Sequence, residues 1–120
     1  MGKKRILVVD DNVEVARSLS KILSAEYNVD TYYDSREAMV AVLAGKYDCV
    51  ISDGEMPFMS GPTLMQQVLL QRPDMKDRFV FHTGAFFAIV TALSGVGSAQ
   101  VLNKPASKIR LLEAVDRVVT

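Results

Sequence analysis

The stretch Asp53-Gly54-Glu55-Met56-Pro57-Phe58-Met59-Ser60-Gly61 decides the fold of this chain. It follows an apolar run over residues 47–52, typical of a buried strand, and precedes a helical pattern over residues 63–71. Asp53 therefore lies where a strand ends, and in open α/β sheets this edge forms the ligand crevice. Pro57 and Gly61 shape the loop, since proline fixes φ and glycine accepts a left-handed backbone. On its own, such an aspartate is more often structural than functional.

A second acidic pair, Asp10-Asp11, ends the apolar run over residues 5–9. If the two strands are parallel neighbours, three carboxylates converge at one edge of the sheet. Crowded carboxylates repel one another and their pKa values rise unless a cation compensates. Hard divalent cations take oxygen ligands of this kind, so the pattern predicts a site for Mg²⁺, with Mn²⁺ as an alternative.

A hydroxyl and an ammonium group follow two further strand-like runs. Thr83 comes after the run over residues 78–82, and Lys104 comes after the run over residues 99–102 and directly before Pro105. The same edge of the sheet would then carry a nucleophile, a metal site, a hydrogen-bond donor and a counter-cation. Phosphoryl transfer to a carboxylate needs these parts, because its catalysis is mostly positioning and charge neutralisation.

Strand-like and helical patterns alternate five times along the chain. This alternation predicts an α/β fold with a parallel sheet and right-handed crossovers. Asn12 and Ser107 are expected to cap the first and last helices. The inward residues expected for the last helix are Ile109, Leu112, Val115 and Val119.

Taken in order, these pieces resemble the receiver domain of two-component response regulators. The resemblance rests on Asp10-Asp11, Asp53-x-x-Met56-Pro57-x-Met59-x-Gly61, Thr83-Gly84-Ala85 and Lys104-Pro105, and it covers nearly all 120 residues. It implies a flavodoxin-like, doubly wound, five-stranded parallel sheet of order 2-1-3-4-5, with five helices on both faces. It also implies that residues 1–120 form a single receiver domain.

The resemblance implies a role for each site residue. Asp53 would be the phospho-acceptor for the phosphohistidine of a sensor histidine kinase or a histidine phosphotransfer domain. The Mg²⁺ ligands would be Asp11 and Asp53 directly, Asp10 through water, and the backbone carbonyl of Glu55. Lys104 would neutralise the phosphoryl oxygens and Thr83 would donate a hydrogen bond to one of them, while Pro57, Gly61 and Pro105 would shape the loops.

The implied function is a switch rather than an enzyme with an external substrate. Its own reactions would be Mg²⁺-dependent self-phosphorylation and autodephosphorylation, and phosphorylation would alter a partner-binding surface. The chain is then either a single-domain response regulator or a receiver from a longer regulator or a hybrid histidine kinase.

Two features depart from the pattern of the family. Receivers commonly carry an aromatic switch residue three positions before the lysine, where this chain has Val101. Gly54 gives a pliable backbone directly after the acceptor. In addition, residues 79–103 contain no Asp, Glu, Lys or Arg. This indicates deeper burial, a short, irregular helix, or a dimer or effector surface over residues 85–102.

Composition limits the binding partners and the cellular setting that the chain can have. The 14 basic and 14 acidic residues cancel, so no bulk attraction to nucleic acid or membrane is expected. The lone cysteine, Cys49, fits a small buried side chain in a reducing, cytoplasmic setting. The single histidine, His82, is interpreted as a strand-end residue with a local hydrogen bond.

Three other functions use similar parts. A haloacid-dehalogenase-like hydrolase would use Asp10 as its nucleophile, but it needs an aspartate two positions on, where this chain has Asn12. A phosphate-independent interaction module would not need the full set of acid, hydroxyl and lysine groups. A flavin-binding flavodoxin-like protein would need a hydroxyl- and glycine-rich phosphate loop after the first strand.

Overall fold

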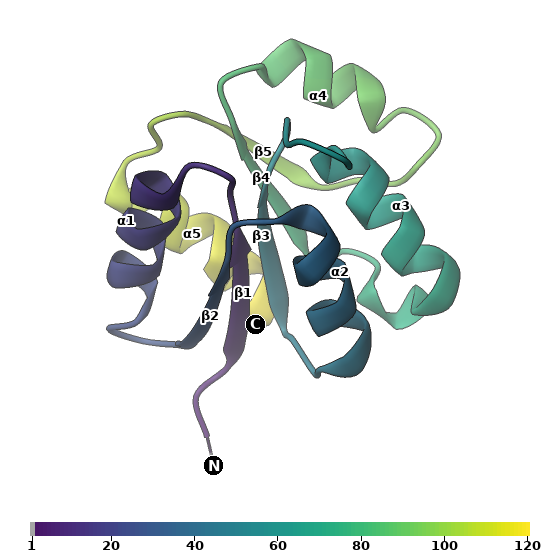
Figure 1. Ribbon diagram of the computed structural model, residues 1–120. Helices are drawn as coiled ribbons and strands as arrows, with labels where there is room; N and C mark the ends of the chain where they lie inside the picture. The colour runs from purple at the N-terminus through teal and green to yellow at the C-terminus, as the bar shows by residue number, and fades with distance from the viewer. Residues whose placement is uncertain (1) are drawn as a thin grey trace.

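Five parallel strands form one sheet, and helices cover both of its faces (Figure 1). The computed structural model describes residues 2–120. The strands are β1 (Arg5–Val9), β2 (Asn28–Tyr32), β3 (Cys49–Asp53), β4 (Phe79–Thr83) and β5 (Gln100–Asn103). Their order in the sheet is β2-β1-β3-β4-β5, which confirms the predicted doubly wound arrangement.

Four α-helices connect the strands, and a fifth follows β5. They are α1 (Val13–Leu23), α2 (Ser35–Ala44), α3 (Gly61–Gln71), α4 (Phe86–Ala92) and α5 (Lys108–Val119), with a short 3₁₀ turn, η1 (Pro73–Met75), before β4. Helices α1 and α5 pack on one face of the sheet, and α2, α3 and α4 pack on the other (Figure 1). Among residues 2–120, no helix has the length and apolar character needed to cross a lipid bilayer.

The alternation of strand side chains produces two separate cores. In β1, Leu7 and Val9 join the core under α2, α3 and α4, whereas Ile6 and Val8 join the core under α1 and α5. A strand that is buried on both faces must be apolar at every position, which explains the continuous run in β1.

Side chains cap the helices where the sequence predicted it. The Asn12 side chain accepts a hydrogen bond from the backbone N–H of Val15 at the start of α1, at 3.1 Å. Ser107 does the same for Arg110 at the start of α5, at 3.2 Å. Each cap satisfies an N–H group that has no partner within the helix, and so fixes where the helix begins.

The prediction that Ile109 points inward was wrong, because its side chain is 71% exposed. The buried stripe of α5 consists instead of Leu111, Ala114 and Val115, with Leu112 half-buried beside it. These positions follow the i, i+3, i+4 spacing of one helical face. Ile109 is two residues before Leu111, about 200° around the helix at 3.6 residues per turn, and therefore faces solvent.

The register of the sheet aligns the ends of the central strands. Val9 pairs with Ser52, and Asp53 pairs with His82. Thr83 then pairs with Asn103, the last residue of β5. The residues that follow these pairs all leave the sheet at the same carboxyl edge, which is where ligands bind in doubly wound folds.

Candidate functional site

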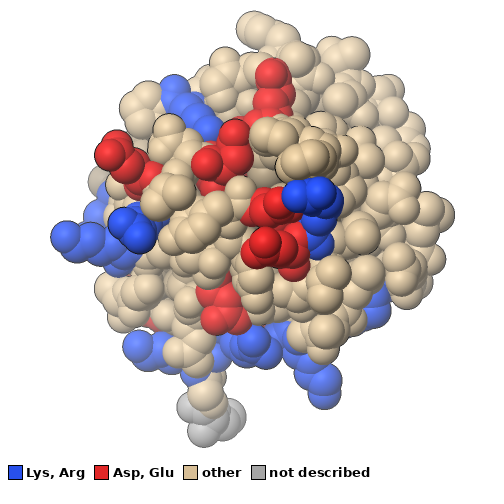
Figure 2. All heavy atoms as spheres, in the orientation of Figure 1, with Lys and Arg blue, Asp and Glu red and all other residues tan. Residues whose placement is uncertain are grey.

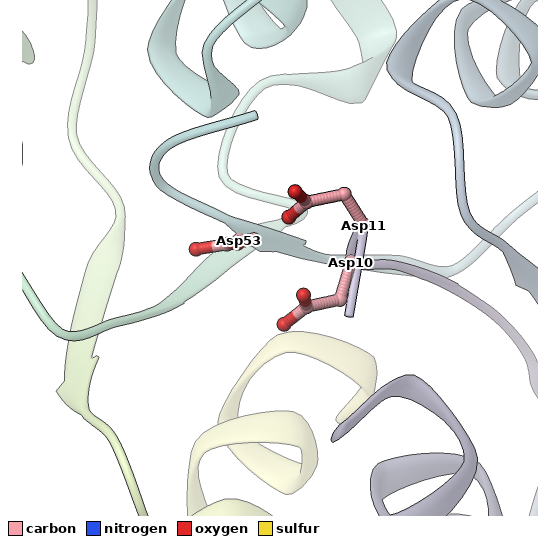
Figure 3. Close-up of side chains that lie close together, drawn as sticks. All are labelled: Asp10, Asp11 and Asp53. Carbon is pink, nitrogen blue, oxygen red and sulfur yellow. The ribbon is translucent and has the colours of Figure 1, made fainter. Parts of the chain in front are cut away.

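Three carboxylates converge at this edge. Asp10 and Asp11 follow the end of β1, and Asp53 is the last residue of β3 (Figure 3). One carboxylate oxygen from each lies within 4.8 Å of the other two. Asp10 and Asp53 are buried, with 1% and 7% of their surface exposed, whereas Asp11 is open to solvent. The predicted convergence is therefore confirmed.

Lys104 compensates part of this negative charge. Its Nζ atom lies 2.9 Å from Oδ2 of Asp10 and 3.2 Å from Oδ2 of Asp53. The backbone fixes the lysine as well, because its N–H donates to the carbonyl of Thr83 at 2.9 Å. Figure 2 shows acidic side chains gathered beside basic ones on this face of the molecule.

The charges at the site do not balance. Burial, and then the charge of Asp10, raise the pKa of Asp53 to about 6, although Lys104 pulls it down. Burial lowers the pKa of Lys104, but its contacts with Asp10 and Asp53 outweigh burial and raise the pKa overall. Lys104 therefore stays protonated, and its single positive charge is too small to neutralise the three carboxylates.

This imbalance fits a hard divalent cation. The cluster offers only oxygen atoms, as Mg²⁺ prefers, and leaves a net negative charge. Asp10 Oδ2 is buried and pairs with Lys104 Nζ at 2.9 Å, but it shares that single ammonium group with Asp53. The acidic triad is thus consistent with the Mg²⁺ site of a receiver domain.

Hydrogen bonds close the loop between β3 and α3. The N–H of Gly61 donates to the carbonyl of Gly54 at 2.9 Å. The Ser35 hydroxyl, from the start of α2, donates to the carbonyl of Pro57 at 3.1 Å. This role of Ser35 could not be predicted, because a serine at the start of a helix looks like an ordinary cap.

Gly61 does not adopt the left-handed backbone that a glycine accepts. Among residues 2–120, the glycines with positive φ are Gly95 and Gly97, and the positive φ of this loop, 71°, belongs to Phe58. A Cβ atom at Gly61 would instead lie 2.3 Å from the carbonyl oxygen of Asp53 and 2.7 Å from the Phe81 ring. Glycine is needed here because the backbone approaches other atoms closely.

Thr83 is buried at the end of β4, one residue past the strand pair formed by Asp53 and His82. Its hydroxyl oxygen accepts a hydrogen bond from the N–H of Ala85 at 3.0 Å. Glu55 is exposed, and its N–H approaches Oδ1 of Asp53 at 3.4 Å. Thr83 and Glu55 therefore lie at the carboxyl edge of the sheet, close to Asp53.

His82 behaves as the sequence predicted. Its Nε2 atom accepts a hydrogen bond from the N–H of Ala106 at 3.2 Å. Burial, and then the charge of Lys104, lower the pKa of His82. This local contact lies beside Pro105, which follows a cis peptide bond.

Helix α4 confirms the expectation of a short helix, but it is not deeply buried, and the dimer or effector surface over residues 85–102 stays a prediction. It is short, seven residues, and the only residue that it buries is Ile89. Phe87 is 84% exposed and Val90 is 45% exposed, so an apolar surface is present as well. Val101 is half-buried and packs against the core that contains Ile89.

A doubly wound sheet with this acid and lysine set at its carboxyl edge defines a signalling module of the receiver class. The model of the response regulator receiver domain family matches residues 6–116. The chain belongs to that family, and hence to two-component signalling.

Similar proteins come from several settings. The transcriptional regulatory protein TcrA of Mycobacterium tuberculosis is 33% identical over 84% of this chain and 40% of its own length. Hybrid signal transduction histidine kinase D of Dictyostelium discoideum is 36% identical over 99% of this chain and 8% of its own. A CheY-like receiver domain protein from Methanospirillum hungatei superimposes with a TM-score of 0.89, at 26% identity over 98% of this chain and 94% of the other.

The chain spans less than half the length of the two curated relatives described above. What those whole proteins do therefore depends in part on regions that this chain does not match. Receiver domains themselves are typically non-enzymatic modules that interact with histidine kinases or phosphotransfer proteins.

Proposed function

We propose that Asp53 accepts a phosphoryl group from the phosphohistidine of a sensor histidine kinase or a histidine phosphotransfer domain. An oxygen of the Asp53 carboxylate attacks phosphorus and forms a P–O bond, while the P–N bond breaks and the histidine nitrogen keeps the electron pair. The contacts of Lys104 with both Asp10 and Asp53 carry this proposal. They place a fixed positive charge beside the one buried carboxylate that ends a strand in the centre of the sheet.

The proposed metal ligands are Asp11 and Asp53 directly, Asp10 through water, and the backbone carbonyl of Glu55. Bound Mg²⁺, or Mn²⁺ in its place, would supply positive charge that offsets the repulsion between a carboxylate and a phosphoryl group. Asp10 contributes to the protein's part of this charge balance by holding Lys104 at 2.9 Å. Asp10 is itself held by the N–H of Asn12, which donates to Oδ1 at 2.9 Å.

Thr83 and Lys104 would stabilise the phosphoryl oxygens. The Thr83 hydroxyl would donate to one oxygen, and the Lys104 ammonium would pair with another. Attack of water on the aspartyl phosphate would release inorganic phosphate and restore the carboxylate of Asp53. The chain therefore needs no external substrate beyond its phosphodonor.

Phosphorylation would switch a surface that contacts a partner or a second copy of the chain over residues 85–102. Support comes from the exposed side chains of Phe87 and Val90 in α4, the helix that follows Thr83 along the chain. Because Val101 has no ring, the surface cannot use an aromatic rotamer at that position as its signal.

The proposal includes the wider setting of the chain. Residues 1–120 would act as a single receiver domain, either alone or within a longer regulator or a hybrid histidine kinase. The buried free thiol of Cys49 suits the reducing cytoplasm.

The test uses acetyl phosphate as donor, with Mg²⁺, and intact-mass measurement. We expect the wild type to gain one phosphoryl group, and we expect no gain with Asp53→Asn or after addition of EDTA. Asp116→Asn, which removes an exposed carboxylate from α5, serves as the matched control and should be labelled like the wild type. Full labelling of Asp53→Asn would reject the assignment.

The same samples separate the alternatives. A hydrolase that uses Asp10 would turn over p-nitrophenyl phosphate, and Asp10→Asn would abolish that turnover. A phosphate-independent interaction module would take no label from any donor. We expect neither result.

A further inference from the structure

The side chain of Ile89 in α4 fills a space directly beside the proposed acceptor. A Cβ atom built on Gly54 would lie 2.5 Å from Cγ1 and 2.6 Å from Cδ1 of Ile89. The same point lies 2.8 Å from the hydroxyl oxygen of Thr83. Ile89, Gly54 and Thr83 therefore meet at one place, next to Asp53 in the chain. Glycine is therefore needed at position 54 for space, a reason that adds to the pliable backbone expected there.

Ile89 is also the main anchor of its helix. It is the only buried residue within α4, and Leu93, which caps the helix, is the next one along the chain. The N-terminal cap, Ala85, offers no side-chain hydrogen bond. The chain after the helix passes through Gly95 and Gly97, both with positive φ. A segment with so few buried contacts has low local stability, and its position depends strongly on where Ile89 sits.

We propose that the contact of Ile89 with Gly54 and Thr83 transmits the phosphorylation state of Asp53 to α4, in place of an aromatic residue at position 101. This inference rests on the proposed function. When the Thr83 hydroxyl turns toward a phosphoryl oxygen, it leaves the N–H of Ala85, to which it is bonded at 3.0 Å. The space beside Gly54 changes shape, Ile89 loses its fit, and α4 loosens. Packed side chains act as such switches because their arrangements are discrete.

The first test is a double-mutant cycle on the free protein. In the wild type, Gly54→Ala places a methyl group on Ile89 and should raise the unfolding equilibrium constant by about tenfold. In the Ile89→Ala background the methyl group meets no isoleucine, and only the Thr83 hydroxyl oxygen remains close to it, at 2.8 Å. The same substitution should therefore raise the unfolding equilibrium constant clearly less than in the wild type. Urea unfolding measures all four proteins. Equal effects of Gly54→Ala in both backgrounds would show that positions 54 and 89 are not coupled, and the proposal would be wrong.

Gly84→Ala is the matched glycine control. Gly84 stands beside Thr83, has no positive φ, and a Cβ atom there would meet nothing within 4 Å. We expect it to leave both the unfolding constant and the labelling of Asp53 close to wild type.

The second test asks whether the contact carries a signal. Beryllofluoride with Mg²⁺, an analogue of the aspartyl phosphate, should speed amide hydrogen exchange over residues 86–93 of the wild type by about tenfold. In Ile89→Ala we expect exchange to be fast already and its ratio with and without beryllofluoride to be close to one. Leu93→Ala removes the other buried side chain of this segment, yet it should keep a wild-type ratio.

The outcomes distinguish this inference from the function on which it rests. If acetyl phosphate labels Asp53 but the exchange ratio is unchanged in Ile89→Ala, the transmission through Ile89 is wrong and the acceptor role stands. If Asp53 takes no label, the acceptor role is wrong, and the double-mutant cycle still decides whether Ile89 and Gly54 are coupled.

Discussion

The acidic crevice and helix α4 lie side by side at one edge of the sheet, but they are held in opposite ways. In the crevice, Asp10, Asp53 and Lys104 are fixed by ion pairs of 2.9 and 3.2 Å, and the two carboxylates are buried. Helix α4 carries no charged residue and buries only Ile89. Its Phe87 side chain is 84% accessible to solvent.

The difference corresponds to two tasks. Chemistry at a carboxylate requires side chains that are held in position before the reaction, which the buried strand ends provide. A reporting element must move at little cost, so it is drawn from the part of the fold with few buried contacts. This contrast requires a rigid crevice and a weakly held α4, and substitutions in each region can test it.

The largest effect is expected for Gly61→Ala. The added methyl group would lie 2.3 Å from the carbonyl oxygen of Asp53, a backbone atom that cannot turn away as a side chain would. We expect a loss of about 3 kcal/mol or more in the free energy of unfolding, measured by urea denaturation. A loss below about 1 kcal/mol would show that the loop yields easily, and the crevice could not then be called rigid.

Lys104→Met should have the next largest effect. It leaves the buried carboxylates of Asp10 and Asp53 without their cation, which costs about 3 kcal/mol in metal-free protein at pH 7.5. Mg²⁺ should restore part of the lost stability, because it supplies the missing positive charge. Lys108→Met, at an exposed position in the first turn of α5, is the matched control and should change stability little. If Lys104→Met were as stable as the wild type, the ion pairs of Lys104 would contribute nothing to the free energy of unfolding.

The pH dependence of Asp53→Asn gives a smaller effect with a definite sign. The pKa of Asp53 is raised from 3.8 to about 6 by burial and by Asp10, so the folded protein binds this proton more tightly than the unfolded chain does. The contribution of Asp53 to stability is therefore fully favourable below about pH 4 and is lost as the pH rises through 6. An asparagine, which stays neutral, avoids this loss.

We therefore expect metal-free Asp53→Asn to gain stability relative to the wild type as the pH rises from 4.5 to 7.5, by about 1–2 kcal/mol. Urea unfolding in EDTA at the two pH values measures it. The Asp116→Asn control should show a flat difference. If the stability advantage of Asp53→Asn instead shrank as the pH rose, the claim that burial and the charge of Asp10 raise the pKa of Asp53 would be wrong.

The crevice could be predicted from the sequence because parallel strands place their carboxyl ends at one edge. Once Asp11, Asp53 and Lys104 were each assigned to a strand end, their convergence followed from topology alone. No distance was needed, and the register confirmed it. Those roles that came from the resemblance to receivers remain proposals for this chain.

Close packing could not be predicted in this way. The reason for Gly61 is an approach between backbone and ring, and the reason for Gly54 is the side chain of Ile89, which is 35 positions further along the chain. Ile109 was placed inward because the helical phase of α5 is set by its contacts with the sheet, and an apolar residue in the first turn fits two phases equally well. Three-dimensional contacts of this kind leave no periodic signal.

The smallest effect on stability is expected for Phe87→Ser in α4. The Phe87 ring is mostly in solvent and has an edge-on contact with Phe86, with ring centroids 5.5 Å apart. Serine and phenylalanine have similar helix propensities, so only the contact between the two rings is lost. The free energy of unfolding should fall by about 0.5 kcal/mol, the lower limit for the contribution of an aromatic pair. Labelling of Asp53 should be unchanged, while any self-association seen by sedimentation velocity with beryllofluoride should weaken. A loss above about 1.5 kcal/mol would mean that α4 is firmly packed, and the contrast between the two regions would fail because both would be rigid.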